Sequence, residues 1–220
     1  MNIERLKFNI SLLGDASVGK TCMVNSLKHI PFDENQIATI GVDEVIDEAK
    51  FDNTLYKFKI FDTAGQERYR SIVTNTLQIS DGFFLVFSIA NRTSFERISF
   101  WINTIKSKVN INQKVLILIG NKIDMENERQ VSHEEASDFA KKYKMKYFET
   151  SAKNGFRIEE AFHNLYEDIY NLNKELENPE DNDDDNNDNV HKGSIQLQKE
   201  QHIESQNKTK KKRKCFKIFQ

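Results

Sequence analysis

The alternation of short apolar runs with longer amphipathic stretches is the feature that most constrains the fold of this chain. Runs typical of β-strands lie at residues 6–13, 42–51, 55–61, 82–89, 114–119 and 146–149. Between most of them, apolar residues recur at three- to four-residue spacing, which is the period of an amphipathic helix. The runs GFFLVFSI and KVLILIG are almost continuously apolar, as expected of parallel strands buried on both faces. We therefore predict an α/β fold with a six-stranded, mostly parallel sheet flanked by helices on both faces.

Two helix starts are predicted from pairs of polar residues. Thr93 with Glu96, and Ser132 with Glu135, have the spacing of a capping box, in which two side chains bond the first free amides of a helix. Apolar positions beyond each pair share one helical face, as do those of the last predicted helix. These faces comprise Ile98, Trp101, Ile102 and Ile105; Ala136, Phe139, Ala140 and Tyr143; and Ile158, Ala161, Phe162, Leu165, Ile169 and Leu172.

Charge is strongly segregated near the carboxyl end. The whole chain has 32 Lys plus Arg against 34 Asp plus Glu, but residues 175–188 hold eight acids and no base, and residues 208–220 hold seven bases and no acid. The run NPEDNDDDNNDN has almost no apolar side chain with which to offset the entropy of ordering. We predict a globular domain at residues 1–175 and a disordered tail at residues 176–220, acidic and then basic.

Several classes of protein are excluded by composition. The longest apolar runs are far shorter than the ~18 residues of a membrane span, and the first residues lack the pattern of a secretion signal. Cys22 and Cys215 are too few and too far apart for a disulfide framework or a structural zinc site. We expect an intracellular protein.

The sharpest chemical signal is the segment GDASVGKT at residues 14–21, which follows a predicted strand and opens a helix. Its glycines allow successive amides to turn inward around phosphate oxygens at the helix start. Lys20 adds a positive charge beside the outer phosphates, and the Thr21 hydroxyl is a suitable magnesium ligand. We assign phosphate binding to Asp15, Ala16, Ser17, Val18, Gly19, Lys20, Thr21 and Cys22.

The base is predicted to bind at the ends of two later strands. NKID, at residues 121–124, follows the run VLILIG, and ETSAK, at residues 149–153, follows the last strand. A carboxylate only accepts hydrogen bonds, so Asp124 favours guanine, which presents two adjacent donors on its Watson–Crick edge. The remaining base contacts are assigned to Asn121, Lys122, Ser151, Ala152 and Lys153. Asp124 argues against an ATP-using phosphate-loop kinase, which is one of two rival functions of a different class.

A third motif, DTAGQE at residues 62–67, follows the strand LYKFKIF. Asp62 is suited to hold a magnesium-bound water, Gly65 to donate its amide to a terminal phosphate, and Gln66 to orient an attacking water.

Together these segments resemble the Ras superfamily of small GTPases, and the Rab family most closely. GDASVGKT, TIGVDE, DTAGQERYRSI, NKID and ETSAK occur in the family's order across about residues 6–175. The resemblance implies a magnesium-dependent GTP/GDP switch that hydrolyses GTP slowly and regulates vesicle traffic. It implies that Thr21 and Thr39 bind the metal directly, that Asp62 does so through water, that Gln66 is catalytic, and that Phe32 packs against the guanine.

The chain departs from the family's pattern at several positions. Glu44 and Phe61 replace aromatic residues of the surface that reads effectors, and Asn75-Thr-Leu-Gln-Ile replaces a run of YYR type. We interpret these changes either as an unusual set of effectors or as neutral drift. Ala16 predicts slow intrinsic hydrolysis, because its methyl group crowds the terminal phosphate. Gln36 stands where many relatives carry an aromatic lid. A GTP-binding scaffold with little hydrolysis, or another Ras-superfamily branch, remains the alternative.

Partners follow from the resemblance and from the tail. The resemblance implies exchange factors, activating proteins and effectors, a monomeric state and no nucleic-acid partner. The basic segment 208–220 predicts peripheral attachment to the cytosolic face of an endomembrane or the plasma membrane. Cys215 is a candidate for lipidation, although the five residues after it do not form a prenylation box.

Overall fold

The computed structural model describes residues 5–34, 39, 41–63 and 70–177, and side chains within them except those of residues 5–7 and 70–74. Contacts divide the chain into two units, Met1–Asn178 and Pro179–Gln220, and every described residue lies in the first. The predicted tail therefore falls outside the described residues apart from its first two positions, which belong to the last helix. No helix in the described ranges is long and apolar enough to cross a membrane.

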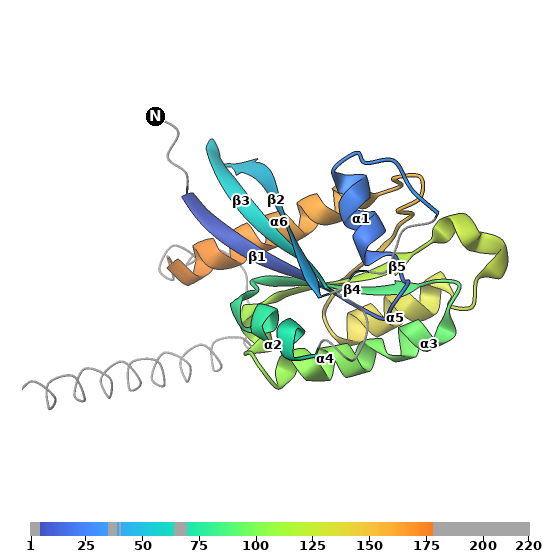
Figure 1. Ribbon diagram of the computed structural model, residues 1–220. Helices are drawn as coiled ribbons and strands as arrows, with labels where there is room; N and C mark the ends of the chain where they lie inside the picture. The colour runs from blue at the N-terminus through green and yellow to red at the C-terminus, as the bar shows by residue number, and fades with distance from the viewer. Residues whose placement is uncertain (1–4, 35–38, 40, 64–69, 178–220) are drawn as a thin grey trace, which may run out of the picture. The chain divides into compact units, whose positions relative to one another are not determined.

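Six strands in the described part of the chain form one sheet, as predicted (Figure 1). They are β1 (Arg5–Leu13), β2 (Val42–Phe51), β3 (Thr54–Thr63), β4 (Gly82–Ser88), β5 (Val115–Asn121) and β6 (Lys146–Glu149), in the spatial order β2-β3-β1-β4-β5-β6. Only β2 pairs antiparallel, with β3, and the other neighbouring strands are parallel. The carboxyl ends of β1, β3, β4, β5 and β6 consequently lie at one edge of the sheet, where ligands bind in open α/β folds.

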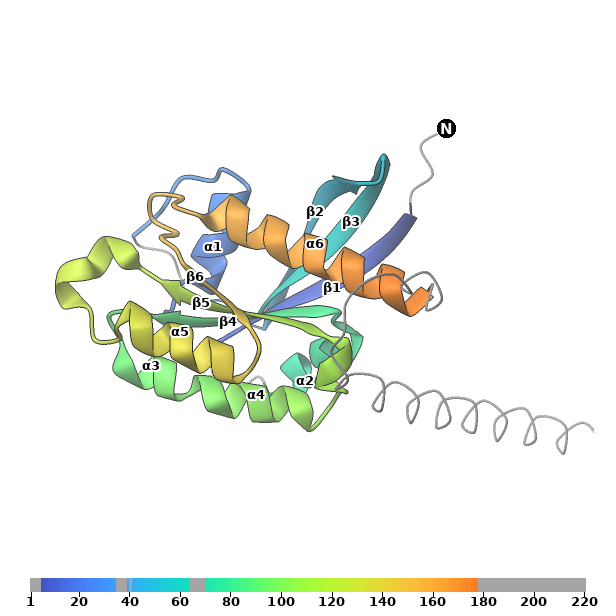
Figure 2. The ribbon, with the colours of Figure 1, turned by 180° about the vertical axis from the view of Figure 1, so that it is seen from behind.

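Helices cover both faces of this sheet. Seen from the two sides in Figures 1 and 2, α1 (Lys20–Leu27) and α6 (Ile158–Glu177) lie on one face. The other face carries α2 (Arg70–Ile79), α3 (Arg92–Glu96), α4 (Ile98–Lys106) and α5 (His133–Lys142). Two short 3₁₀ helices, η2 (Ile111–Gln113) and η3 (Ile123–Glu128), flank β5.

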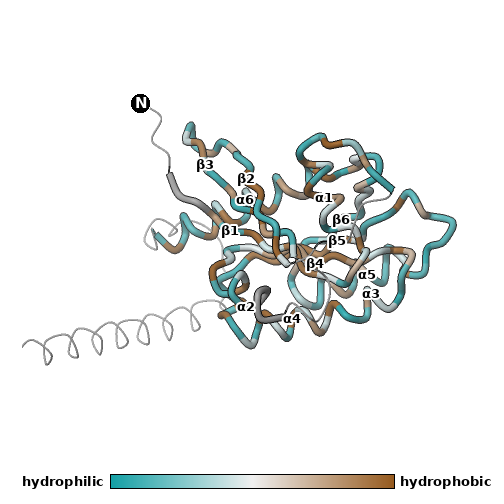
Figure 3. Tube along the Cα trace, in the orientation of Figure 1, coloured by the Kyte–Doolittle hydropathy of each residue, from teal (hydrophilic) through white to brown (hydrophobic). Residues whose placement is uncertain are grey.

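Alternating side chains of the strands supply a separate apolar core to each face. Phe84 and Val86 pack toward α1 and α6, whereas Phe83, Leu85 and Phe87 of the same strand pack toward α2–α5. All seven residues of β4 are buried, which explains its continuous apolar run. Figure 3 shows the same distribution, with hydrophobic residues concentrated in the central strands and hydrophilic ones on the outside of the helices.

The predicted helix faces are confirmed, but one predicted helix start is wrong. Ser132 caps α5 by accepting a hydrogen bond from the Glu135 amide, as expected. Thr93, however, lies inside α3, and the cap is Asn91, whose side chain accepts from the Ser94 amide. Asparagine is as good an N-cap as threonine, so the helix begins earlier at no cost.

Candidate nucleotide-binding site

The loop between β1 and α1 is shaped by two glycines that admit no side chain. A Cβ atom at Gly14 would lie 2.1 Å from the carbonyl oxygen of Val86, and one at Gly19 would lie 2.3 Å from the Asn121 amide nitrogen. Gly19 also has a φ of 98°, which side chains disfavour. The loop therefore lies directly against the ends of β4 and β5, and its curvature opens amides at the start of α1 toward a ligand.

Lys20 is the first residue of α1, and its ammonium group is held inside this loop. Its Nζ donates to the carbonyl oxygens of Gly14, at 2.9 Å, and Asp15, at 2.8 Å. The side chain is only 5% exposed, and this burial lowers the pKa of Lys20 to about 8 against the opposing fields of Asp62 and Asp15. A buried cation bonded mainly to neutral carbonyls favours an anion beside it.

Three oxygen-bearing side chains meet next to Lys20. The Thr21 hydroxyl lies 2.6 Å from the Thr39 hydroxyl and donates to Asp62 Oδ2 at 2.5 Å, while Thr39 Oγ1 is 3.4 Å from the same oxygen. Asp62 is 2% exposed, and burial raises its pKa although Thr21 and Lys20 favour the charged form. The second carboxylate oxygen, Oδ1, is buried without a hydrogen-bond partner among the described residues.

This cluster fits a magnesium ion that shares its ligands with phosphate. Hydroxyl and carboxylate oxygens are the donors that Mg²⁺ prefers, and the unpartnered Asp62 oxygen is available to a metal-bound water. In the described ranges, no group of three or more His, Cys, Asp or Glu side chains is arranged to hold a metal. Mg²⁺ commonly takes part of its coordination from the phosphates of a bound nucleotide.

Asn121, the last residue of β5, joins the loops that are predicted to bind the phosphates and the base. It is 1% exposed; its amide nitrogen donates to the Val18 carbonyl at 2.9 Å. Its amide oxygen accepts from Thr150 Oγ1 at 3.2 Å and from the Ala152 amide at 3.1 Å. Asn121 therefore acts as a brace between loops, a role that the motif by itself did not indicate.

The predicted base-reading residues lie together. Ser151, which is buried, donates its hydroxyl to Asp124 Oδ1 at 2.5 Å, so the orientation of the exposed Asp124 carboxylate is fixed. Lys122 occupies a left-handed backbone conformation before η3. Lys153 Nζ lies 5.6 Å from the centre of the Phe32 ring, which is 40% exposed, and 3.1 Å from Glu34. The Lys153 side chain and the Phe32 ring thus lie together.

Three positioning contacts were missed by sequence reasoning. Arg129, which follows η3, pairs with Glu149 at 2.8 Å, and Arg97 pairs with Asp15 at 3.2 Å. Thr150 is fully buried and bonds Asn121. Arg129 lies 20 residues from its partner, so no local pattern indicated this pair.

The other predicted site residues are placed as follows. Ala16 and Ser17 are exposed on the phosphate loop, whereas Val18 is buried. Cys22 lies in α1, and its half-buried side chain packs against the core. Asp62 lies within β3 instead of after it. Gly65, Gln66, Gln36 and Cys215 lie outside the described residues.

A strand, a glycine loop and a helix that enclose a buried lysine define a phosphate-loop nucleotide-binding protein. Comparison with known proteins is more specific. Residues 9–171 match the Ras family. The rat "Ras-related protein Rab-13" is 38% identical over 162 residues, which cover 74% of this chain and 79% of the relative. The human "Ras-related protein Rab-8B" is 41% identical over 170 residues, which cover 77% and 82%.

The chain therefore belongs to the Ras family, and it is a Rab-like small GTPase of the class that regulates vesicle traffic. The predicted family and fold are thereby confirmed. Another Rab-8 relative, "Ras-related protein Rab-8A" of Bos taurus, is 40% identical over 171 residues.

Proposed function

We propose that the chain is a magnesium-dependent switch that binds GTP, hydrolyses it slowly to GDP and phosphate, and changes partners between the two states. The observation that carries this proposal is the arrangement around Lys20. A buried ammonium group lies beside two hydroxyls and a carboxylate that has one unpartnered oxygen within the described ranges. A phosphate chain with its metal would satisfy all of these groups at once.

Bound magnesium would neutralise charge on the phosphate oxygens. Thr21 and Thr39 would hold the ion directly and Asp62 would hold one of its waters. Lys20 would turn from the Gly14 and Asp15 carbonyls toward the phosphates, which stabilise its charged form. Gln66 and Gly65 are proposed to orient water and to bind the terminal phosphate, respectively, by resemblance to the family.

Thr39 links the metal cluster to the segment that precedes β2. Its hydroxyl contacts Thr21, so a bound terminal phosphate and metal would hold this segment in one arrangement. Hydrolysis removes the phosphate contact, and the segment is then free to change. The surface around β2 would therefore report which nucleotide is bound.

That surface differs chemically from the aromatic one expected from the family. Glu44 forms an ion pair with Lys59 at 2.5 Å across the β2–β3 hairpin. Phe61 is only 2% exposed, and Lys59 Nζ lies 5.3 Å from its ring centre. We propose that effectors meet a charged hairpin here, and that exchange factors and activating proteins set the balance of the two states.

Ala16 is exposed on the phosphate loop, which supports the proposal that its methyl group slows intrinsic hydrolysis. In single-turnover assays, Ala16→Gly should hydrolyse GTP several-fold faster than the wild type. An unchanged rate would contradict this part of the proposal.

We propose peripheral attachment to the cytosolic face of a membrane through the basic segment 208–220, with Cys215 as a candidate lipid acceptor. About 1 kcal/mol for each basic residue near an anionic leaflet supports reversible binding. A tagged chain that lacks residues 208–220 should lose its membrane signal in cells. An unaltered distribution would reject the anchor.

Base selection gives the decisive test of the whole proposal. GTP should displace a labelled guanine nucleotide and ATP should not, since Ser151 holds Asp124 ready to accept two donors. Asp124→Asn should shift the preference from guanine to xanthine nucleotides, because xanthine offers an acceptor where guanine offers a donor. Equal affinity for GTP and ATP in the wild type would overturn the proposal.

A further inference from the structure

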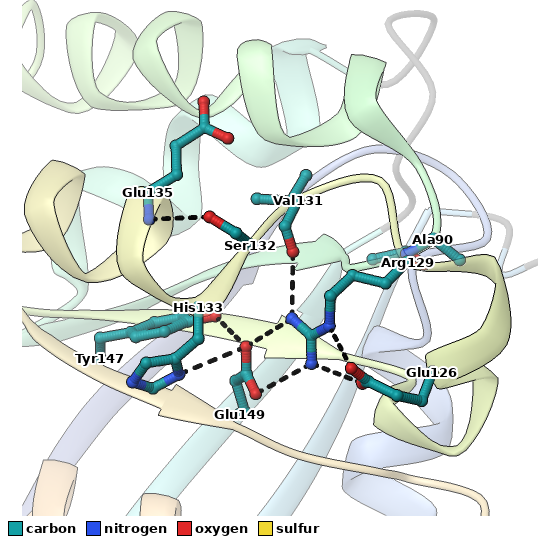
Figure 4. Close-up of polar contacts among 10 residues, drawn as sticks. Ala90, Glu126, Arg129, Val131, Ser132, His133, Glu135, Tyr147 and Glu149 are labelled. Atoms are coloured by element: carbon teal, nitrogen blue, oxygen red, sulfur yellow. Dashed lines mark hydrogen bonds and ion pairs between the residues drawn. The ribbon is translucent and has the colours of Figure 1, made fainter.

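Glu149 is the centre of a polar cluster at the end of β6 (Figure 4). Arg129 donates to both of its oxygens, at 2.8 and 3.1 Å, and the Tyr147 hydroxyl donates to Oε1 at 2.8 Å. His133 Nδ1 lies 3.4 Å from the same oxygen, and Arg129 also binds Glu126. We call Tyr147, Arg129 and Glu149 the Glu149 clamp.

The clamp joins both segments that are proposed to read the base. Glu149 ends β6, and the next residues bond Asn121 and Asp124 through Thr150 and Ser151. Arg129 directly follows η3, the short helix that contains Asp124. The two oxygens of one carboxylate thus tie the end of the Asp124 segment to the start of the Ser151 segment.

Tyr147 is positioned for this contact by the core of the sheet. Its ring is stacked with Phe87 at a centroid distance of 6.4 Å and an interplanar angle of 10°. Its hydroxyl lies so close to β5 that a Cβ atom at Gly120 would be 2.7 Å away, so only glycine fits beneath it. The hydroxyl is therefore a fixed donor and not a group that finds its partner by rotation of a flexible side chain.

We propose that the Tyr147 hydroxyl is a positioning group for guanine recognition, acting through Glu149 on the Ser151–Asp124 pair. The proposal rests on the proposed function, and it adds a residue outside the base-reading motifs. Without the hydroxyl, Glu149 keeps Arg129 but loses the bond that sets its position along β6. The Thr150–Ser151 segment then holds Asp124 less tightly.

The test compares GDP with IDP. The base of IDP lacks the 2-amino group, which in guanine would donate a hydrogen bond to Asp124. Dissociation rates of both nucleotides are measured for the wild type, Tyr147→Phe and Tyr170→Phe. Tyr170 is a matched control, since its hydroxyl also donates to a carboxylate, that of Asp52 at 2.6 Å, between α6 and the turn joining β2 to β3. Unfolding temperatures of the GDP complexes are recorded in parallel.

We expect Tyr147→Phe to release GDP on the order of three- to tenfold faster. This is less than the loss of a direct hydrogen bond to a charged group would give, because the effect reaches the base only through Glu149 and Ser151. IDP release should change less, so the preference for GDP over IDP should fall. Tyr170→Phe should leave that preference unchanged.

An unchanged preference in Tyr147→Phe, whatever the unfolding temperature, would overturn the positioning role and leave the proposed function intact. A wild type that shows no preference for GDP over ADP would instead contradict the proposed function itself.

Discussion

The phosphate side and the base side of the site satisfy their polar groups in different ways. On the phosphate side, Lys20 is buried against backbone carbonyls and Asp62 keeps an oxygen without a hydrogen-bond partner in the described part of the chain. On the base side, Asn121 uses both ends of its amide, and Asp124 is held by Ser151. On the base side the polar side chains already hydrogen-bond one another, whereas on the phosphate side they are arranged for a charged ligand.

Because of this difference, substitutions on the two sides should affect nucleotide affinity and the stability of the nucleotide-free protein differently. Groups that await a ligand carry a cost of burial in the nucleotide-free protein, and binding offsets that cost. Groups that bond one another stabilise the fold whether or not nucleotide is present. Substitutions on the phosphate side should therefore reduce affinity without lowering the stability of the nucleotide-free protein, and substitutions on the base side should reduce both.

Lys20→Met should have the largest effect on binding. We expect GDP affinity to fall by on the order of 100-fold, because hydrogen bonds to charged groups contribute ~1.5–3 kcal/mol each. The free energy of unfolding of the nucleotide-free protein should stay the same or rise, since a buried charge is removed. Fluorescence titration and urea unfolding measure the two quantities.

Lys28→Met is the control for this variant, because Lys28 is the C-cap residue of the same helix and pairs with Asp47. It should leave GDP affinity close to that of the wild type. A loss of nucleotide-free stability in Lys20→Met that matches the loss in Asn121→Ala would remove the contrast between the two sides.

Asn121→Ala should lower stability even without nucleotide. The change leaves the Val18 carbonyl, the Thr150 hydroxyl and the Ala152 amide without the partner they now have. Unsatisfied buried groups cost ~1–3 kcal/mol each, so we expect the free energy of unfolding to fall by about 2–4 kcal/mol. Urea unfolding of nucleotide-free protein measures this, with Asn103→Ala on the exposed face of α4 as control. Equal stability of the two variants would show that Asn121 is not a brace.

The smallest expected effect concerns the pH dependence of Glu149. Burial alone would raise the pKa of Glu149, but the hydrogen bonds from Arg129 and Tyr147 hold it below its ordinary value. A depressed carboxyl pKa stabilises the fold above the unfolded-state pKa, ~4.5, and this contribution disappears as pH falls through the folded-state value. Glu149→Gln should therefore be about 1–2 kcal/mol less stable than the wild type near pH 7.

The free energies of unfolding of the wild type and Glu149→Gln should become equal as the pH is lowered through the acid range. Urea unfolding at a series of pH values measures the gap. A difference that stays constant down to pH values well below 4 would show that the Glu149 charge does not stabilise the clamp.

Much of the architecture could be predicted from local patterns. The run GFFLVFSI predicted a strand buried on both faces, and β4 is that strand. The glycines of residues 14–21 predicted a loop that opens into a helix, because a backbone turn of that kind requires them. The start of α3 could not be predicted in this way, because Asn91 and Thr93 are both suitable N-cap residues. Only the backbone conformation in the folded chain shows that Asn91 is the cap.

The sequence by itself determined the order of the strands along the chain, the phosphate loop and the identity of the residues at the strand ends, because glycine conformation, apolar periodicity and side-chain chemistry are local properties. Tertiary structure alone decided that Asn121 braces Val18 against Ala152 and that Arg129 pairs with Glu149. These contacts join residues that come together only when neighbouring parallel strands align at one edge of the sheet, and no spacing along the chain encodes that meeting.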